Sequence, residues 1–186
     1  QEQQDQTTGA VAGCAGGAIV GALIGGSRGA AIGCAAGGLI GWGTVRMSQY
    51  NAYQARSSSA DQNSYRRADP DFYALNRSGG GSAVKIRGVD ASPDRARSGT
   101  TIVAVTDYSV VTRGSVNVQE SSALKKDGRQ LVELKPSPQT RGSGGWESRA
   151  EFPVPSDAEP GTYVIEHRVK AGSSYDKQIS TFVVRG

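Results

Sequence analysis

Histidine, methionine and cysteine are scarce in this chain of 186 residues, which has one His, one Met and two Cys. Metal centres and redox sites depend mainly on His and Cys side chains, so this composition excludes most chemistry of that kind. The sequence also lacks a phosphate-binding P-loop, a nucleophile elbow and any His/Cys metal-ligand spacing. We therefore predict no catalytic residue, no cofactor and no metal, and a protein that is not an enzyme.

Clusters of one charge sign are missing as well. The formal net charge is +4, from 21 Lys and Arg and 17 Asp and Glu, but no basic run is longer than two residues. A protein that follows the phosphates of a nucleic acid needs a basic stripe, so we predict no nucleic-acid partner. The single histidine, His167, lies in an alternating pattern and is expected to be an exposed or hydrogen-bonded strand residue, not a catalytic base.

The stretch from Gly9 to Val45 carries only one charge, Arg28, and its glycines recur at every fourth position. These glycines are Gly9, Gly13, Gly17, Gly21, Gly25, Gly29, Gly33, Gly37 and Gly41. On a helix, residues four apart share a face, so the glycines would form a ridge without side chains that allows close helix packing. Turn-forming residues around Arg28 divide the stretch into two apolar segments. The spacing predicts a transmembrane helical hairpin, with a low-complexity Gly/Ala linker as the alternative.

These nine glycines resemble the glycine-zipper two-transmembrane domain of bacterial surface antigens and small outer-membrane proteins, over residues 7–47. The resemblance implies a membrane-inserted hairpin that packs against copies of itself. Segments of this length suit a thin bilayer such as the outer membrane. We expect a bacterial cell-envelope location, most simply the outer membrane, with the C-terminal part periplasmic or extracellular. Because the chain starts at Gln1, we also expect that a signal peptide has been removed.

Other residues of this N-terminal region suggest further roles. Cys14 and Cys34 share one phase of the glycine repeat, so they are either small apolar fillers or a disulfide, more plausibly between neighbouring subunits. Trp42, Arg46 and Tyr50 follow the apolar stretch and are typical of residues at a membrane interface.

From Ala83 onward the sequence alternates with a period of two, and about seven short β-rich runs are separated by turn signals. Their number and spacing predict an immunoglobulin-like β-sandwich. Tyr163, at the start of a late strand, is a candidate for the "tyrosine corner" of such folds. The predicted core residues are Val84, Ile86, Ile102, Val118, Leu131, Trp146, Phe152, Tyr163, Ile165, Phe182 and Val184.

The predicted fold class is α+β with segregated parts. It comprises a polar tail (1–8), a glycine-zipper hairpin (9–47), a polar connector (48–82) and an all-β sandwich of about seven strands (83–186). The predicted function is that of a structural envelope protein. It would homo-oligomerise into a ring or array, with membrane lipid, its own copies or another envelope protein as partners. The alternatives are a pore-forming oligomer and a membrane-anchored binding or adhesion module.

Overall fold

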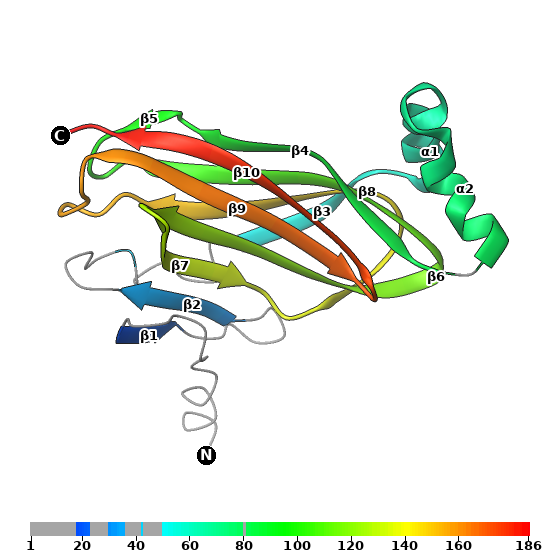
Figure 1. Cartoon of the computed structure of the whole chain (residues 1–186), viewed down its shortest axis with the longest axis horizontal. Helices are drawn as coiled ribbons and strands as arrows, with labels where there is room; N and C mark the ends of the chain where they lie inside the picture. The colour runs from blue at the N-terminus through cyan, green and yellow to red at the C-terminus, as the bar shows by residue number, and fades with distance from the viewer. Residues whose placement is uncertain (1–17, 23–29, 36–41, 43–49, 80) are drawn as a thin grey trace, which may run out of the picture.

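The computed structural model describes residues 18–22, 30–35, 42, 50–79 and 81–186 (Figure 1). Within these residues one ten-stranded sheet curls on itself, and two short helices stand at one end. The helices are α1 (Ser58–Ala68) and α2 (Pro70–Gly79). The strands are β1 (Ala18–Ala22), β2 (Ala30–Ala35), β3 (Tyr50–Arg56), β4 (Ala83–Ser92), β5 (Arg95–Ala96), β6 (Thr101–Lys126), β7 (Arg129–Lys135), β8 (Gln139–Pro153), β9 (Gly161–Ala171) and β10 (Ser174–Val184).

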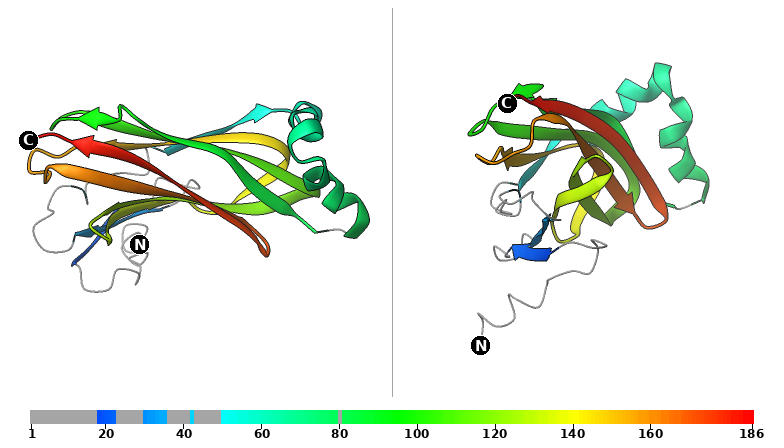
Figure 2. Two further views of the ribbon diagram at one scale, coloured as in Figure 1. Left: turned by 45° about the horizontal axis from the view of Figure 1, so that its top comes forward. Right: turned by 60° about the vertical axis from the view of Figure 1, so that its left-hand side comes forward.

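Strand β6, 26 residues long, connects the two halves of the sheet. Its first half pairs with β4 and with the C-terminal part of β8, while its second half pairs with β9 and β7. The pairing of β6 with β8 shifts register between Val110 and Ser115, next to Gly114, whose φ of 75° favours glycine. This irregularity lets the long strand bend, and the sheet becomes a half-barrel (Figure 2).

Side chains of β10 satisfy the free edge of β4, which has no described backbone partner on that side. Ser174 Oγ accepts a hydrogen bond from the Val84 amide at 3.0 Å, and Asp176 Oδ2 accepts one from the Ile86 amide at 2.7 Å. Gln178 Nε2 donates to the Ile86 carbonyl at 3.2 Å. These side-chain contacts take the place of backbone hydrogen bonds from a neighbouring strand, because buried or half-buried backbone groups need partners.

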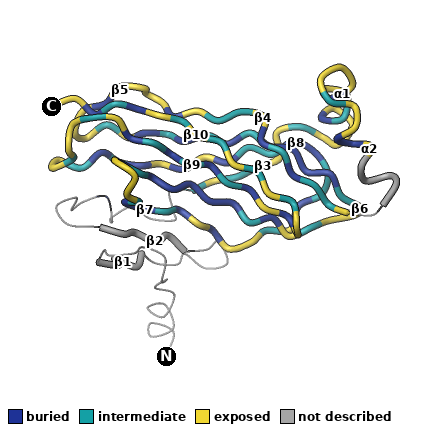
Figure 3. The backbone as a smooth tube through the Cα atoms, in the orientation of Figure 1, coloured by how far each residue is buried: buried dark blue, intermediate teal, exposed yellow. Residues whose placement is uncertain are grey.

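The core lies inside the curl, and along β9 buried positions alternate with more exposed ones (Figure 3). Every predicted core residue is buried except Trp146, which is only partly buried. Tyr163 and Phe182 stack with their ring centroids 5.2 Å apart. Tyr163 also donates a hydrogen bond to the Glu159 carbonyl at 2.6 Å, which is the contact expected of a tyrosine corner.

The predicted fold class is wrong, because the described residues form one curled sheet and not a helical hairpin followed by a separate seven-stranded sandwich. In the part after Ala83, the difference between the predicted sandwich and the observed sheet lies in strands β6 and β8. The prediction was of short runs, but β6 continues through Gly114 and β8 through residues 142–145 as long bent strands that belong to both halves of the sheet.

The glycine-zipper assignment is also wrong. Residues 18–22 and 30–35 are antiparallel strands, with Gly21 opposite Ile32 and Gly33 opposite Val20, and β2 continues the sheet beside β7. A spacing of four is a multiple of two, so it places glycines on one face of a strand as well as of a helix. The other zipper positions, Cys14 and Arg46 lie outside the described residues, as do most of the residues around them.

The predicted outer-membrane location, which depended on this hairpin, is likewise not supported. Among the described residues, neither helix has the length and apolar character needed to cross a bilayer. Trp42, expected at a membrane interface, is instead fully buried in the β core. Its ring centroid lies 5.3 Å from that of Tyr163 and 6.4 Å from that of Phe182.

Candidate binding cleft

A cleft of about 210 Å³ lies between β3 and the start of β8. Its lining residues are Tyr50, Asn51, Ala52, Pro136, Gln139 and Arg141. Three of these come from β3, and the others come from the β7–β8 connection and β8. The cleft therefore joins segments that are about ninety residues apart in the sequence.

A buried carboxylate, Glu120, lies beneath this cleft and is only 4% exposed. It accepts hydrogen bonds from the hydroxyl groups of Tyr50 and Tyr108. Burial, followed by the charge of Glu120, raises the pKa of both tyrosine hydroxyls well above the ordinary value. Both hydroxyls consequently stay protonated and continue to donate to the carboxylate.

Arg141 supplies the positive charge of the same cluster and is 8% exposed. Its Nε donates to the Tyr108 hydroxyl at 3.0 Å, and its Nη2 lies 3.7 Å from Glu120 Oε1. The guanidinium also stacks over Trp146, 4.4 Å from the ring centroid, and the Trp146 indole donates to the Gly142 carbonyl at 3.1 Å. These contacts hold the guanidinium in one position at the cleft.

The bend of β6 assembles this cluster, since Tyr108 lies before the bend and Glu120 after it. Both side chains occupy inward-facing positions of the strand, in phase with the core residues Val110 and Val118. We define the buried cluster as Tyr50, Tyr108, Glu120, Arg141 and Trp146. Its side chains come from β3, β6 and β8, so their relative positions depend on the tertiary fold.

A second buried carboxylate, Asp61, joins the helices to the sheet. It accepts hydrogen bonds from Arg56 Nε at 2.8 Å and Ser109 Oγ at 3.0 Å, and also from the Tyr73 hydroxyl. Arg87 Nη1 lies 3.4 Å from the same carboxylate. Since every oxygen of Asp61 is engaged and the side chain is fully buried, this cluster has a structural role.

His167 is fully buried between Thr106 and Ser180. Its Nδ1 lies 2.8 Å from Thr106 Oγ1 and its Nε2 lies 2.7 Å from Ser180 Oγ. Burial lowers its pKa to about 4, so the ring is neutral near pH 7. Of the two alternatives expected for this histidine, an exposed or a hydrogen-bonded strand residue, the structure shows the second. Among the described residues, no group of three or more His, Cys, Asp or Glu could hold a metal ion.

Of the residues selected from the sequence, only Tyr50 reaches the cleft, and it does so as part of the buried cluster and not as a membrane anchor. Sequence reasoning missed Glu120 and Arg141. Glu120 could have been noticed, because an acidic residue two positions after the core residue Val118 in an alternating strand faces inward. Asp61 has no comparable signal, since its partners come from β3, β4, β6 and α2.

Comparison with known proteins identifies no family. No protein-family model matches the sequence, and no curated protein matches it. Among solved structures, one similar chain is the Pseudomonas fluorescens alkylpurine DNA glycosylase AlkC, with a TM-score of 0.44 and 19% identity over 69% of this chain and 35% of the other. Another is a family 123 glycoside hydrolase from Clostridium perfringens, with a TM-score of 0.41 and 13% identity over 57% and 27% of the two chains.

A third similar structure is the sporulation control protein Spo0M of Bacillus subtilis, with a TM-score of 0.35 and 12% identity over 58% of this chain and 51% of the other. The chain thus spans about a third of the glycosylase and about half of Spo0M. At these TM-scores the likenesses carry no functional argument, and no family assignment follows from them.

Proposed function

We propose that this chain is a non-catalytic binding protein, which holds an uncharged polar ligand, or a polar group of a partner, in the cleft between β3 and β8. The observation that carries the proposal is the placement of a buried Glu120–Arg141 charge pair directly beneath an open cleft. The polar atoms of His167 and Asp61 are already hydrogen-bonded within the fold. The buried cluster is therefore the strongest candidate site among the described residues.

The energetic argument is that a buried charge pair is a poor way to stabilise a fold. Removing two charges from water costs several kcal/mol per ion, and an apolar replacement is often as stable. A pair that is nevertheless built into a cleft wall, with shifted tyrosine pKa values around it, is typical of a site that has to recognise something. The proposal interprets the buried cluster as such a recognition element.

The chemistry of the lining indicates the class of ligand. Glu120 and Arg141 have opposite charges, so the cleft has no strong preference for an ion of either sign. Asn51 and Gln139 contribute carboxamides, which both donate and accept hydrogen bonds, while Tyr50 and Pro136 contribute apolar surface. An uncharged hydroxyl-bearing or amide-bearing group, such as one sugar unit or a peptide bond, suits this mixture.

A fluorescence titration tests the proposal, because Trp146 belongs to the buried cluster and the only other tryptophan, Trp42, lies in the core. The probes are a panel of monosaccharides and N-acetyl amino-acid amides. Arg113, an exposed arginine elsewhere on the sheet, provides the control. A saturable change in tryptophan fluorescence that is lost in Arg141→Met and kept in Arg113→Met supports the proposal. A change that is equal in both variants contradicts it.

Self-association is a second candidate, and the edge of β3 favours it. Residues 50–54 of β3 contain no charged residue and no proline, and no described residue pairs with their outer edge. Edge strands without charge or proline are prone to pair with another strand. We propose an antiparallel contact with β3 of a second copy, which a two-fold axis would make self-complementary.

Light scattering on the full chain tests this second candidate. Tyr53, on the exposed face of β3, is 43% exposed. Tyr53→Lys should convert a dimer to a monomer because it adds a charge to the edge, whereas Tyr53→Phe should leave the dimer intact. A wild-type chain that is monomeric at high concentration would rule out this contact.

A further inference from the structure

Three arginines surround an open hollow at the end of the sheet that carries β5 and the C-terminal end of β10. The hollow has a volume of about 410 Å³, and its lining residues are Pro93, Arg95, Ala96, Arg97, Thr100 and Arg185. All three arginines are exposed. The hollow is distinct from the cleft beside β3, with which it shares no lining residue.

Strand pairing brings these arginines together from two parts of the sequence. β5 runs parallel to the end of β10, with Arg95 opposite Val183, and the Arg185 amide donates to the Ala96 carbonyl at 2.9 Å. The turn after β5 is fixed as well, because the Arg97 amide donates to Thr100 Oγ1 at 3.2 Å and the Thr100 amide donates to the Arg97 carbonyl at 3.0 Å. The three side chains therefore extend from a hydrogen-bonded backbone.

These three arginines lack the ion pairs that three other arginines of the sheet form. Arg56, Arg141 and Arg168 each have a carboxylate oxygen within 4 Å. Within the described residues, no carboxylate lies within 4 Å of a side-chain nitrogen of Arg95, Arg97 or Arg185, and the hollow has no acidic lining residue. Three like charges that line one hollow raise its positive potential, and a bound anion would lower it.

We propose that this hollow binds a ligand that carries two or more phosphate or sulfate groups. The guanidinium group is planar and presents paired N–H donors that match tetrahedral oxyanions, and this makes arginine well suited to such groups. Three arginines around one hollow match a ligand with several oxyanions better than a single phosphate ion. Neutralisation by the ligand also removes the mutual repulsion of the three side chains.

Isothermal titration of the full chain with sodium tripolyphosphate and with sucrose octasulfate tests the proposal at low ionic strength. We expect saturable binding of at least one probe. Arg97→Gln with Arg185→Gln should weaken that binding by about tenfold or more, as loss of charge-assisted hydrogen bonds does. Binding should also weaken with added salt, because the pairs are exposed. The tighter probe identifies whether phosphate or sulfate groups are preferred.

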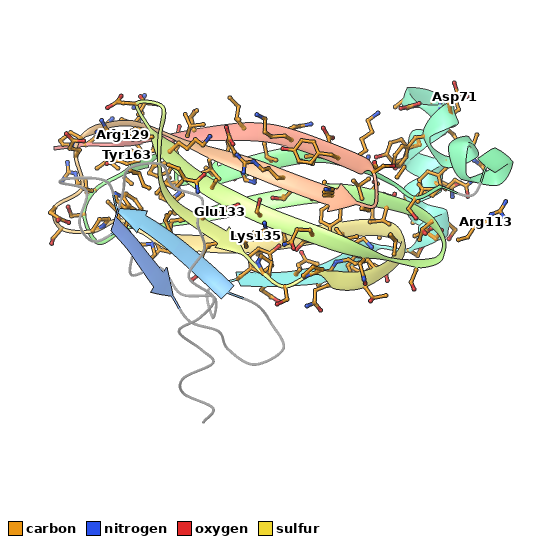
Figure 4. The ribbon with its side chains drawn as sticks, turned by 60° about the horizontal axis from the view of Figure 1, so that its bottom comes forward. Asp71, Arg113, Arg129, Glu133, Lys135 and Tyr163 are labelled. Atoms are coloured by element: carbon orange, nitrogen blue, oxygen red, sulfur yellow. The ribbon has the colours of Figure 1, made fainter. Side chains whose placement is uncertain are left out.

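The matched control is Arg67→Gln with Arg113→Gln, which also removes two positive charges from exposed arginines. Arg113 is exposed and lies near the far end of the sheet, away from Arg129 and Tyr163 (Figure 4). This control leaves every lining residue of the hollow in place, so binding should be nearly unchanged. Equal weakening in the control and in the double variant of the hollow would show that the attraction is only net charge, and it would overturn the proposal. Failure of both probes to bind at low salt would overturn it too.

Discussion

Arg56 and Asp61 form a hydrogen-bonded ion pair of 2.8 Å, which links the end of β3 to the first turn of α1. The Arg56 guanidinium also reaches Asp107 on β6 at 2.7 Å, so one side chain bridges a helix and two strands. Asp61 is fully buried, and the charge of Arg56 compensates for its removal from water. This pair fixes the position of the helices relative to the curled sheet.

Asp61→Ala should therefore destabilise the fold strongly. Removing one partner of a buried pair costs about 3 kcal/mol or more, because the other groups lose their acceptor. Urea denaturation of the full chain measures this loss. Asp71→Ala is the control, since Asp71 is exposed on α2 (Figure 4) and should change the free energy of unfolding by less than about 1 kcal/mol. Similar losses in both variants would refute the role given to Asp61.

Phe182→Ala should also be costly, since Phe182 is 1% exposed and stacks on Tyr163. A buried Phe to Ala change lowers the free energy of unfolding by about 3–5 kcal/mol. Ile179→Ala, three residues earlier on the same strand, removes a side chain that is 58% exposed and should cost little. If the two denaturation curves coincide, the inward phase assigned to β10 is incorrect.

His167 should make the fold less stable as the pH falls below neutrality. Its pKa is about 4 in the folded chain and about 6.5 in an unfolded one, so below pH 6.5 the unfolded state binds a proton that the folded state excludes. Between pH 7.5 and 5 the loss is about 2 kcal/mol, and it continues towards pH 4. Denaturation at each pH should show this slope in the wild type and a flatter one in His167→Gln. An unchanged slope would mean that other groups cause it.

The two tyrosines of the buried cluster should not ionise in moderately alkaline solution. Burial and Glu120 raise the pKa of Tyr50 and Tyr108. At about pH 11, above the ordinary tyrosine pKa of about 10, the tyrosinate absorbance of the folded chain should be the same in wild type, Tyr50→Phe and Tyr108→Phe. If the absorbance of either variant is lower than that of the wild type by the amount of one tyrosinate, the tyrosine replaced in that variant ionises in the wild type. Its hydroxyl would then be accessible to solvent and not part of a buried network.

The strands after Ala83 were predictable because apolar and polar residues alternate along a strand that buries only one of its two faces. Ile102, Phe152 and Ile165 occupy the predicted inward positions for this reason. The segments at 18–22 and 30–35 were not predictable from glycine spacing, because a period of four suits a strand face as well as a helix face. The β-branched residues Ile19, Val20 and Ile32 were the signal for strands that the glycine pattern obscured.

The candidate sites were harder to predict than the strands, because long-range contacts create them. Glu120 and Arg141 meet only after β6 bends, and Arg97 meets Arg185 only after β5 pairs with β10. No local pattern marks such pairs. The length of β6 was itself hidden, since Gly114 resembles a strand end although the strand continues beyond it.

The measurement that tests the central proposal most directly is NMR mapping of polar fragments on the full chain. We predict that sugars or acylated amino-acid amides shift the backbone amides of Asn51, Ala52, Gln139 and Arg141, which line the cleft. The same fragments should leave these amides unshifted in Arg141→Met. Shifts confined to other surfaces, or shifts of the cleft amides that persist in Arg141→Met, would contradict the assignment of the cleft as a binding site.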